Sequence, residues 1–520
     1  MTSKVAAAPI DPHSISEFRR WSVTLSGLLG AVSMILSATV VNVAVPSIMG
    51  AYGIDQTIAQ WASTVFITTM VASQLMSVWV VAHLGQRNAY AMTLLLFAAG
   101  AIVSTIAPNM DTLIAGRIMQ GIAAGIVQPL VLSTIISVFP IERRGFAVSM
   151  YSVGVTLAPS FGPVVGGAIL DALTWRHIFI VPLPLAFIAF LLGLSFMPQE
   201  RKKGPKPPFD WTGLVLVVTA CFSVMSGLAN GQRWGWHSNE VLVLLAGGTG
   251  AGIVFLWHQM HSKNPMLDVS LFKDPSFASA MVIAFLFGAG NFATNYAIPV
   301  FTQQVQGFTA TAAGMVLVPA GIFLFLITPL AGRLNDHVSP RYPITAGVLL
   351  FVVAAFFISK SDVNTAFLVM VLFTMLSRLA IGLVMPAMGA AAIRAVPEHK
   401  INAGAATYNF VRQLGGAFGT LVFVVITEQR TAFHADAMAA TQTSGNPLSR
   451  EFIEKVGRML GESGLPDAQQ TAGALNFLSK VIYAQATTLG FQDAFIVSAI
   501  VFSTALVPAW ILGRTTKTGA

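Results

Sequence analysis

Long apolar stretches separated by short polar segments run through most of the chain. A helix that crosses a bilayer needs about 20 predominantly apolar residues. Stretches of that kind predict fourteen membrane-spanning helices, at 22–46, 60–81, 89–107, 112–136, 145–170, 177–197, 211–229, 240–258, 277–300, 310–331, 343–359, 364–390, 403–427 and 490–512. Because this number is even, both ends of the chain are expected on the same side of the membrane.

The composition agrees with a chain that lies mainly in lipid. Of the 520 residues, 10% are charged and 55% are hydrophobic, whereas soluble domains contain about 25% charged residues. The mean hydropathy is +0.73. The single cysteine, Cys221, excludes a disulfide within one chain. The first twenty residues lack an apolar core followed by a small-residue cleavage site, so no cleavable signal peptide is expected.

The basic residues set the predicted orientation. Short segments on the side of the two termini hold 18 Lys and Arg, and the opposite short loops hold only Arg176, Arg233 and Lys360. Basic residues stay on the cytoplasmic side, so both termini are expected in the cytoplasm of a bacterial cell with the chain in its inner membrane. The net charge of +8 follows from this topology, and no nucleic-acid partner is expected.

An internal repeat relates the two ends of the chain. Predicted helices 1–6 correspond to helices 9–14, and helices 7 and 8 are inserted between them. The repeat pairs His83 with His337, Arg87 with Arg341, Arg117 with Arg378, and Gly121 with Gly382. Two six-helix halves around a site at the midplane is a common plan for secondary transporters.

These observations divide the chain into segments. We predict a cytoplasmic tail at 1–21, a six-helix bundle at 22–197, a linker at 198–210, two inserted helices at 211–258, a cytoplasmic loop at 259–276, a second six-helix bundle at 277–512 and a tail at 513–520. A long extracytoplasmic loop at 428–489 separates the last two helices.

Five motifs follow one another in the order of a known family. Residues 36–46 read LSATVVNVAVP, 117–125 read RIMQGIAAG, 162–167 read GPVVGG, 264–272 read NPMLDVSLF and 409–416 read NFVRQLGG. Together they resemble the 14-helix drug–proton antiporter family of the major facilitator superfamily, particularly the EmrB-like exporters. The resemblance implies an all-α major facilitator fold arranged as 6+2+6 helices, and the export of small molecules.

The resemblance also assigns roles and shows departures. In this family, the motif that contains Gly154, Pro159, Gly162, Pro163, Gly166 and Gly167 accompanies export; close helix packing is the alternative reading. The family has an aspartate where this chain has Ser37. In the first copy of the gate motif, Val78 and Ala82 replace the usual Gly and Asp. The second copy keeps both, so the expected gate residues are Arg87, Gly332, Asp336 and Arg341.

Ionisable residues inside a span are costly and therefore suggest function. None of the 21 acidic residues is central in a predicted span, but Arg117, Arg378 and Arg412 are embedded. Arg412 shares one helix face with Asn409, Gln413, Gly416 and Thr420. This face predicts a cavity, and an arginine that bonds carbonyl groups to lock the fold is the alternative. Arg117 either lines a cavity or snorkels to the interface, and Arg378 is expected to be structural.

The polar positions together predict a substrate cavity that is positive and lacks a countercharge. Its expected members are Ser33, Ser37, Asn42, Arg117, Gln120, Asn291, Asn295, Asn409, Arg412 and Gln413. Such a cavity should favour anionic, zwitterionic or neutral amphiphiles over lipophilic cations.

The long loop at 428–489 contains two segments with helical apolar spacing, around residues 452–460 and 474–482. Both predict amphipathic helices that lie against the membrane or a partner. The loop resembles that of EmrB-like exporters, which work with a periplasmic adaptor and an outer-membrane channel. A cover that binds no partner is the alternative.

These features favour a secondary exporter that works by alternating access. Without the aspartate at position 37, protons could move through edge groups such as Asp111 or Asp493, the substrate could carry the proton, or the protein could be an uncoupled facilitator. A sensor that kept the fold and lost transport is a further alternative. No enzyme motif, metal site or cofactor site is found, and His258 and His261 are expected to be solvated.

Overall fold

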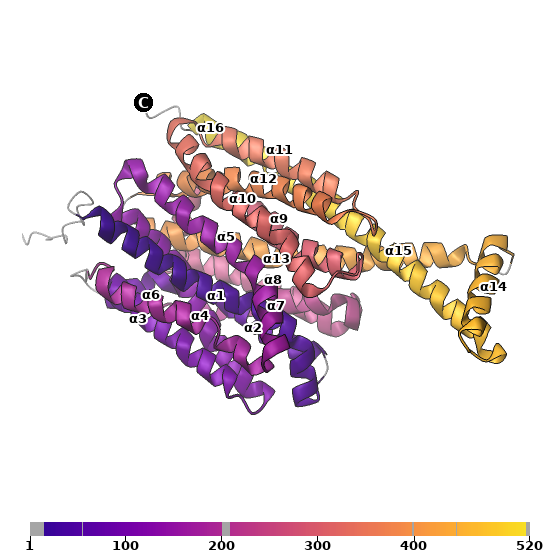
Figure 1. Ribbon diagram of the computed structural model, residues 1–520. Helices are drawn as coiled ribbons and strands as arrows, with labels where there is room; N and C mark the ends of the chain where they lie inside the picture. The colour runs from indigo at the N-terminus through magenta and orange to yellow at the C-terminus, as the bar shows by residue number, and fades with distance from the viewer. Residues whose placement is uncertain (1–14, 55, 200–207, 398–399, 444, 516–520) are drawn as a thin grey trace, which may run out of the picture.

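The computed structural model describes residues 15–54, 56–199, 208–397, 400–443 and 445–515. Within these ranges the chain forms helices joined by turns, with no strand, so the predicted all-α class is confirmed (Figure 1). Some side chains within the helices, among them those of Asn42, Pro163 and Asp336, lie outside the description. The predictions that concern these three side chains therefore fall outside the described residues.

The first bundle is formed by residues before 200. It consists of α1 (Glu17–Tyr52), α2 (Gln56–Ser73), η2 (Gln74–Met76), α3 (Ser77–Thr105), α4 (Met110–Val138), α5 (Ile141–Ala172), η3 (Trp175–Phe179) and α6 (Leu183–Phe196). Ser16 and Asn109 cap α1 and α4 by accepting hydrogen bonds from free N–H groups of the first turns. Helix α4 is the centre of this bundle and packs against α1, α2 and α3.

The second bundle repeats this arrangement. It consists of η4 (Val269–Lys273), α9 (Pro275–Gln304), α10 (Ala310–His337), α11 (Arg341–Ile358), α12 (Phe367–Arg394), α13 (Ile401–Ala440), α14 (Pro447–Glu462), α15 (Asp467–Ser503) and α16 (Leu506–Thr515). Asp274 caps α9 through hydrogen bonds from two N–H groups. Helix α12 packs against α9, α10 and α11, as α4 packs within the first bundle.

The two bundles meet along two pairs of surfaces. Helix α10 packs against α5, and α13 packs against α4 and η2. One contact between the bundles is a cation–π interaction in which the Arg333 guanidinium lies 5.6 Å from the centre of the Phe146 ring. Helix α1 begins and α16 ends at the same end of the bundles (Figure 1).

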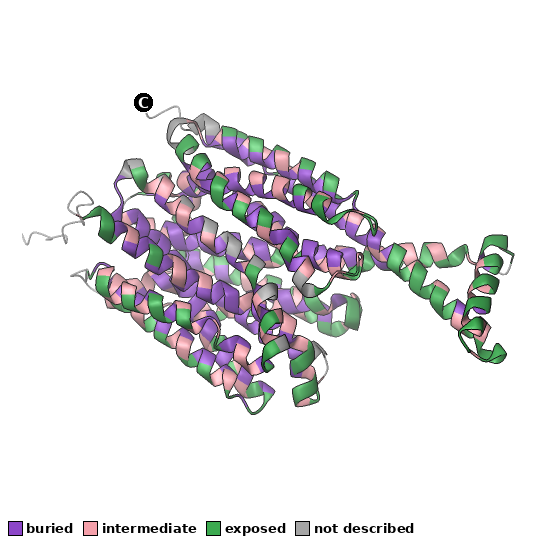
Figure 2. Cartoon of the chain, viewed as in Figure 1, coloured by how far each residue is buried: buried purple, intermediate pink, exposed green. Residues whose placement is uncertain are grey.

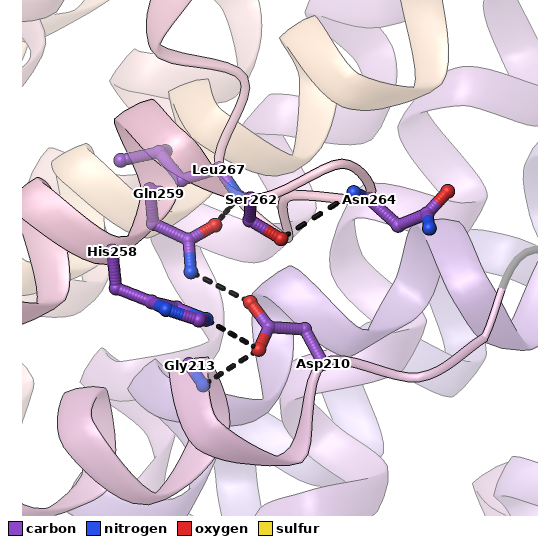
Figure 3. Close-up of polar contacts among 7 residues, drawn as sticks. All are labelled: Asp210, Gly213, His258, Gln259, Ser262, Asn264 and Leu267. Atoms are coloured by element: carbon purple, nitrogen blue, oxygen red, sulfur yellow. Dashed lines mark hydrogen bonds and ion pairs between the residues drawn. The ribbon is translucent and has the colours of Figure 1, made fainter.

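The inserted helices α7 (Trp211–Trp234) and α8 (Asn239–His261) pack against each other, and α7 also contacts α2 and α13. Asp210 joins their ends, because it accepts hydrogen bonds from Gly213 N–H, from His258 Nε2 and from Gln259 Nε2, each at 2.8 Å (Figure 3). Burial opposes ionisation of Asp210, but these hydrogen bonds hold its pKa below the ordinary value.

The expectation of a solvated His258 is therefore wrong. Its side chain lies against the largely buried Asp210 carboxylate, which the linker brings to the end of α8. His261 is exposed, as expected, and its Nδ1 atom lies 2.8 Å from the Trp257 carbonyl oxygen.

The described residues contain twelve stretches that are long and apolar enough to cross a membrane. One of them, Trp61–Thr105, spans two predicted helices, because the chain stays helical on both sides of a break at Gly85. Gly85 has φ 77°, a value in the region that favours glycine. The total of fourteen crossings stays a prediction.

The segment at 428–489 differs from the predicted loop. Helix α13 continues without interruption for 40 residues to Ala440, and α15 is one helix of 37 residues. Their outer ends and α14 project beyond the bundles, and most of their surface is exposed (Figures 1 and 2). Both predicted amphipathic segments exist, but they pack against each other through α14 and α15. The Phe452 and Phe477 rings stack at 6.2 Å in this contact.

Candidate functional site

A cavity of about 220 Å³ lies between the two bundles. Helices α4 and α5 form one wall, and α12 and α13 form the other. Its position is in the half of the bundles that is predicted to face the cytoplasm. The wall residues are Leu132, Ile136, Arg144, Val148, Tyr151, Ser152, Val155, Met385, Pro386, Gly389, Ala390, Ile393, Arg394, Val396, Ile401, Tyr408, Asn409 and Arg412.

The wall combines an apolar surface with positive charge. Three arginines, Arg144, Arg394 and Arg412, are among the described residues that line the cavity, and none of those residues is a carboxylate. Arg144 and Arg394 lie near the helix ends on the predicted cytoplasmic side, whereas Arg412 is 3% exposed. An amphipathic molecule with a negative end could therefore place that end toward Arg412 and its apolar part against the aliphatic side chains.

Arg412 is held by amide groups from both bundles. Its Nη2 donates to Gln128 Oε1 of α4 at 3.4 Å and to Asn409 Oδ1 of its own helix at 3.3 Å. Gln413 Nε2 also donates to Gln128 Oε1, at 3.4 Å. The buried Nε of Arg412 has no hydrogen-bond partner. Arg412 thus bonds side-chain amides, not backbone carbonyls, and its Nε remains available to donate to another group.

Arg117 belongs to a separate network inside the first bundle. Its Nε donates to the Ala62 carbonyl at 2.8 Å, and its Nη1 donates to Ser37 Oγ at 3.1 Å and to Gln120 Oε1 at 2.9 Å. Its guanidinium also lies 4.2 Å from the centre of the Phe66 ring. Arg117 is completely buried, so it does not snorkel to the interface, and neither it nor its partners line the cavity described above.

Arg378 occupies the matching place in the second bundle. Its Nη1 donates to Asn291 Oδ1 at 3.2 Å, and its Nη2 donates to Asn295 Oδ1 at 2.9 Å. Asn295 Nδ2 in turn donates to Asn291 Oδ1 at 3.0 Å. The repeat thus pairs α4 with α1 through Arg117, and α12 with α9 through Arg378.

Of the ten predicted cavity residues, the structure places Asn409 and Arg412 in the wall of this cavity. Ser37, Arg117 and Gln120 form the first network, and Asn291 and Asn295 belong to the second. Ser33 is buried and donates to the Gly30 carbonyl of its own helix. Gln413 lies beside the wall through its bond to Gln128.

The predicted exporter motif lies against α1. A Cβ atom added at Gly154 would clash with Leu28, and one added at Gly162 would clash with Thr39. A Cβ atom added at Gly166 would lie 3.2 Å from the nearest atoms of Val40, which is a tight contact. These glycines therefore allow α5 to approach the helix that carries Ser37. Pro159 and Gly167, further members of the motif, are half-buried.

The predicted gate residues do not form one cluster. The Arg87 N–H donates to the Pro198 carbonyl, and Arg87 Nη1 donates to Gln199 Oε1 at 3.2 Å, so Arg87 holds the end of α6. Arg341 lies over the ring of its neighbour Tyr342, and Gly332 is buried within α10.

Sequence reasoning missed several members of the cavity wall. Tyr151, Tyr408 and Arg144 lie on faces that also carry apolar residues, so a span-by-span reading did not select them. Tyr151 and Arg144 are seven residues apart on α5, which is the spacing of one helix face, and this spacing was the available signal.

The two acidic residues considered as proton carriers lie at the predicted extracytoplasmic side. Asp493 pairs with Arg430 and His434, and Asp111 is exposed. Within the described residues no group of three or more His, Cys, Asp or Glu side chains is placed to hold a metal ion.

Comparisons with known proteins agree with the fold described above. The family model described as Major Facilitator Superfamily matches residues 27–420. The Multidrug export protein EmrB of Haemophilus influenzae is 27% identical over 494 residues, which cover 94% of each chain. The Lincomycin resistance protein LmrB of Listeria monocytogenes is 29% identical over 406 residues, or 78% of this chain and 85% of that relative.

Two solved structures share the fold. An inward-facing, unoccupied bacterial homologue of the human lysosomal transporter Spinster has a TM-score of 0.57 and 15% identity, and the match covers 96% of this chain and 98% of that one. The human organic anion transporter MFSD10 has a TM-score of 0.56 and 14% identity, with 93% and 99% covered. At these identities the likeness concerns the fold alone.

Proposed function

Because the chain belongs to the Major Facilitator Superfamily, a family of membrane transporters, we propose that it exports amphipathic small molecules by alternating access. The preferred substrates are anionic, zwitterionic or neutral. The observation that supports this preference is the cavity between the bundles, whose described wall has three arginines and no carboxylate. The names of the relatives, multidrug export and lincomycin resistance, support export of small organic molecules.

Binding in the proposed cavity has two parts. The negative or polar end of the substrate bonds Arg412, whose Nε has no other partner. The apolar part contacts Ile136, Val148 and Ile393 in the wall. A buried guanidinium without a carboxylate attracts an anion strongly, because the surrounding dielectric is low.

The proton-motive force is the proposed energy source, and it acts through its electrical component. Moving one elementary charge across 100 mV is worth about 2.3 kcal/mol. The inside-negative potential of a bacterial cell therefore drives an anion outward without a proton-carrying aspartate at position 37. This proposal assumes the predicted orientation, with both termini in the cytoplasm of a bacterial cell and the chain in its inner membrane.

The projection formed by α14 and the outer ends of α13 and α15 is proposed to bind a periplasmic adaptor, which leads to an outer-membrane channel. Leu448, Met459, Phe477 and Tyr483 are each at least half exposed there. Exposed apolar side chains outside the bilayer suit a protein partner. Deleting residues 441–466 and joining α13 to α15 should leave uptake by vesicles intact and abolish drug resistance of whole cells.

The substrate proposal is tested with inverted membrane vesicles. Wild type should accumulate an anionic or weak-acid drug in preference to a lipophilic cation. Arg412→Ala should lower uptake of the anion at least tenfold, because the loss of a charged hydrogen bond costs about 1.5–3 kcal/mol. Arg412→Lys keeps the charge and should retain a measurable part of the uptake. Full uptake by Arg412→Ala, at equal protein in the membrane, would remove Arg412 from the site.

The energy source is tested in the same vesicles. Valinomycin with potassium collapses the membrane potential and should abolish uptake of the anion, whereas nigericin collapses the pH gradient and should not. Loss of uptake with nigericin alone would mean that protons are coupled through a group outside the cavity wall. Uptake that is insensitive to both ionophores would contradict the proposed energy source.

A further inference from the structure

Arg117 is a buried cation without a matching negative charge. Its side chain is completely buried, and no ion pair to a carboxylate is formed by it within the described part of the chain. An isolated charge in a low-dielectric interior costs several kcal/mol unless it is paired. The Phe66 ring offsets part of this cost through a cation–π contact, but a ring is not a full countercharge.

The hydrogen bonding around Arg117 is also incomplete, and only donors are left over. Arg117 Nη2 and Gln120 Nε2 are both buried and have no hydrogen-bond partner. Arg117 Nη2 is attached to the same carbon as Nη1, and Gln120 Nε2 is attached to the same carbon as Oε1. Both free donors are therefore next to the hydrogen bond between Arg117 Nη1 and Gln120 Oε1. Two unpartnered N–H groups favour a ligand that accepts hydrogen bonds, and the positive charge beside them favours a negative ligand.

The corresponding network in the second bundle has no buried donor of this kind among the described residues. Both terminal nitrogens of Arg378 donate to amide oxygens, of Asn291 and Asn295. No nitrogen of Arg378 or of either asparagine is among the buried unpartnered atoms of the described residues. Completely buried donors without a partner therefore distinguish the Arg117 network from the Arg378 network.

We propose that Arg117 Nη2 and Gln120 Nε2, with the Ser37 hydroxyl beside them, bind a small monovalent anion such as chloride. The anion accepts hydrogen bonds from both free N–H groups and neutralises the guanidinium. Water could satisfy the same donors but would leave the charge unpaired. The complete burial of Arg117 and Gln120 restricts the ligand to a monatomic or similarly small ion.

The test measures binding and does not depend on transport. The full chain is purified, and its thermal unfolding is followed in chloride and in gluconate at constant ionic strength. Gluconate is a bulky organic anion, and we expect a completely buried site to exclude it. Wild type should therefore unfold about 1–4 °C higher in chloride, with a saturable dependence on the chloride concentration. Equal unfolding temperatures of wild type in the two salts would overturn the proposal.

Ser37→Asp is the informative variant, because it places a carboxylate where Ser37 Oγ lies 3.1 Å from Arg117 Nη1. Its unfolding temperature should no longer depend on chloride. Asn291→Asp is the matched control in the other bundle and should keep the full chloride response. An undiminished response in Ser37→Asp would contradict the site. If Ser37→Asp does not accumulate, Gln120→Glu supplies the carboxylate from α4 and is expected to behave in the same way.

Discussion

The two bundles each bury one arginine at the same place in the repeat, and they satisfy it differently. Arg378 donates to two asparagines of α9. Arg117 instead contacts one serine of α1, one glutamine of its own helix, the Ala62 carbonyl of α2 and the Phe66 ring. The side chain that faces each arginine accounts for the difference. An asparagine supplies an amide oxygen and further donors, but Ser37 supplies one hydroxyl and is too short to cover the guanidinium. A repeated fold can therefore keep the position of a buried charge while different contacts stabilise that charge in each half.

The comparison is tested most strongly by removing each charge. Arg378→Met and Arg117→Met both leave an amide oxygen without its donor. The Ala62 carbonyl, which Arg117 also bonds, keeps its hydrogen bond within α2 when Arg117 is replaced. Arg117→Met, however, also removes a nitrogen that has no partner. In chloride-free buffer, Arg378→Met should therefore be more destabilising, by about 1–3 kcal/mol. Denaturant midpoints of the two purified variants measure this order. Greater destabilisation by Arg117→Met would mean that its network is complete.

Removing one amide from each network is the next sharpest test. Asn295→Leu leaves Arg378 Nη2 without its acceptor. Gln120→Leu leaves Arg117 Nη1 bonded to Ser37 and removes an unpartnered donor. Asn295→Leu should therefore cost about 1–2 kcal/mol more than Gln120→Leu. The same denaturation assay measures the difference, and equal costs would argue against the free Gln120 donor.

The smallest expected effect is on substrate choice. In chloride-free buffer, where no anion occupies the proposed site, Ser37→Asp and Asn291→Asp each add a negative charge beside one buried arginine. A unit charge acting over about 15 Å at an effective dielectric of about 20 is worth roughly 1.1 kcal/mol. Each variant should therefore lower uptake of an anion relative to uptake of a neutral drug by about sixfold in inverted vesicles. An unchanged ratio in both variants would contradict the idea that positive charge sets the preference for anionic substrates.

The membrane-spanning pattern and the repeat could be read from the sequence, because both depend on local composition and spacing. The three embedded arginines were found for the same reason. Their separation into two networks and one cavity wall could not be predicted, since it depends on the rotation of α4, α12 and α13 about their axes, which tertiary packing sets. The contact of His258 with Asp210 was missed because 48 residues separate the two in the chain.

For the outer segment at 428–489, the helices were predicted but their packing partner was not. Its apolar spacing correctly predicted helices, but spacing alone cannot distinguish a helix that lies on a membrane from one that packs on a neighbouring helix. The prediction also ended the thirteenth span at residue 427, where polar residues begin. Helix α13 continues past that point to Ala440, because its backbone hydrogen bonds do not depend on the lipid.

Because α13 is continuous, it connects the cavity wall rigidly to the outer projection. Arg412 lies on the cavity wall and Ala440 at the outer end of the same helix, 28 residues or about 42 Å away. If α13 tilts by about 10° as the bundles rock, the outer end moves by about 7 Å, while atoms near Arg412 move far less. A pair of labels on the projection could then record opening and closing of the cavity as a change in distance, without altering any residue that touches the substrate.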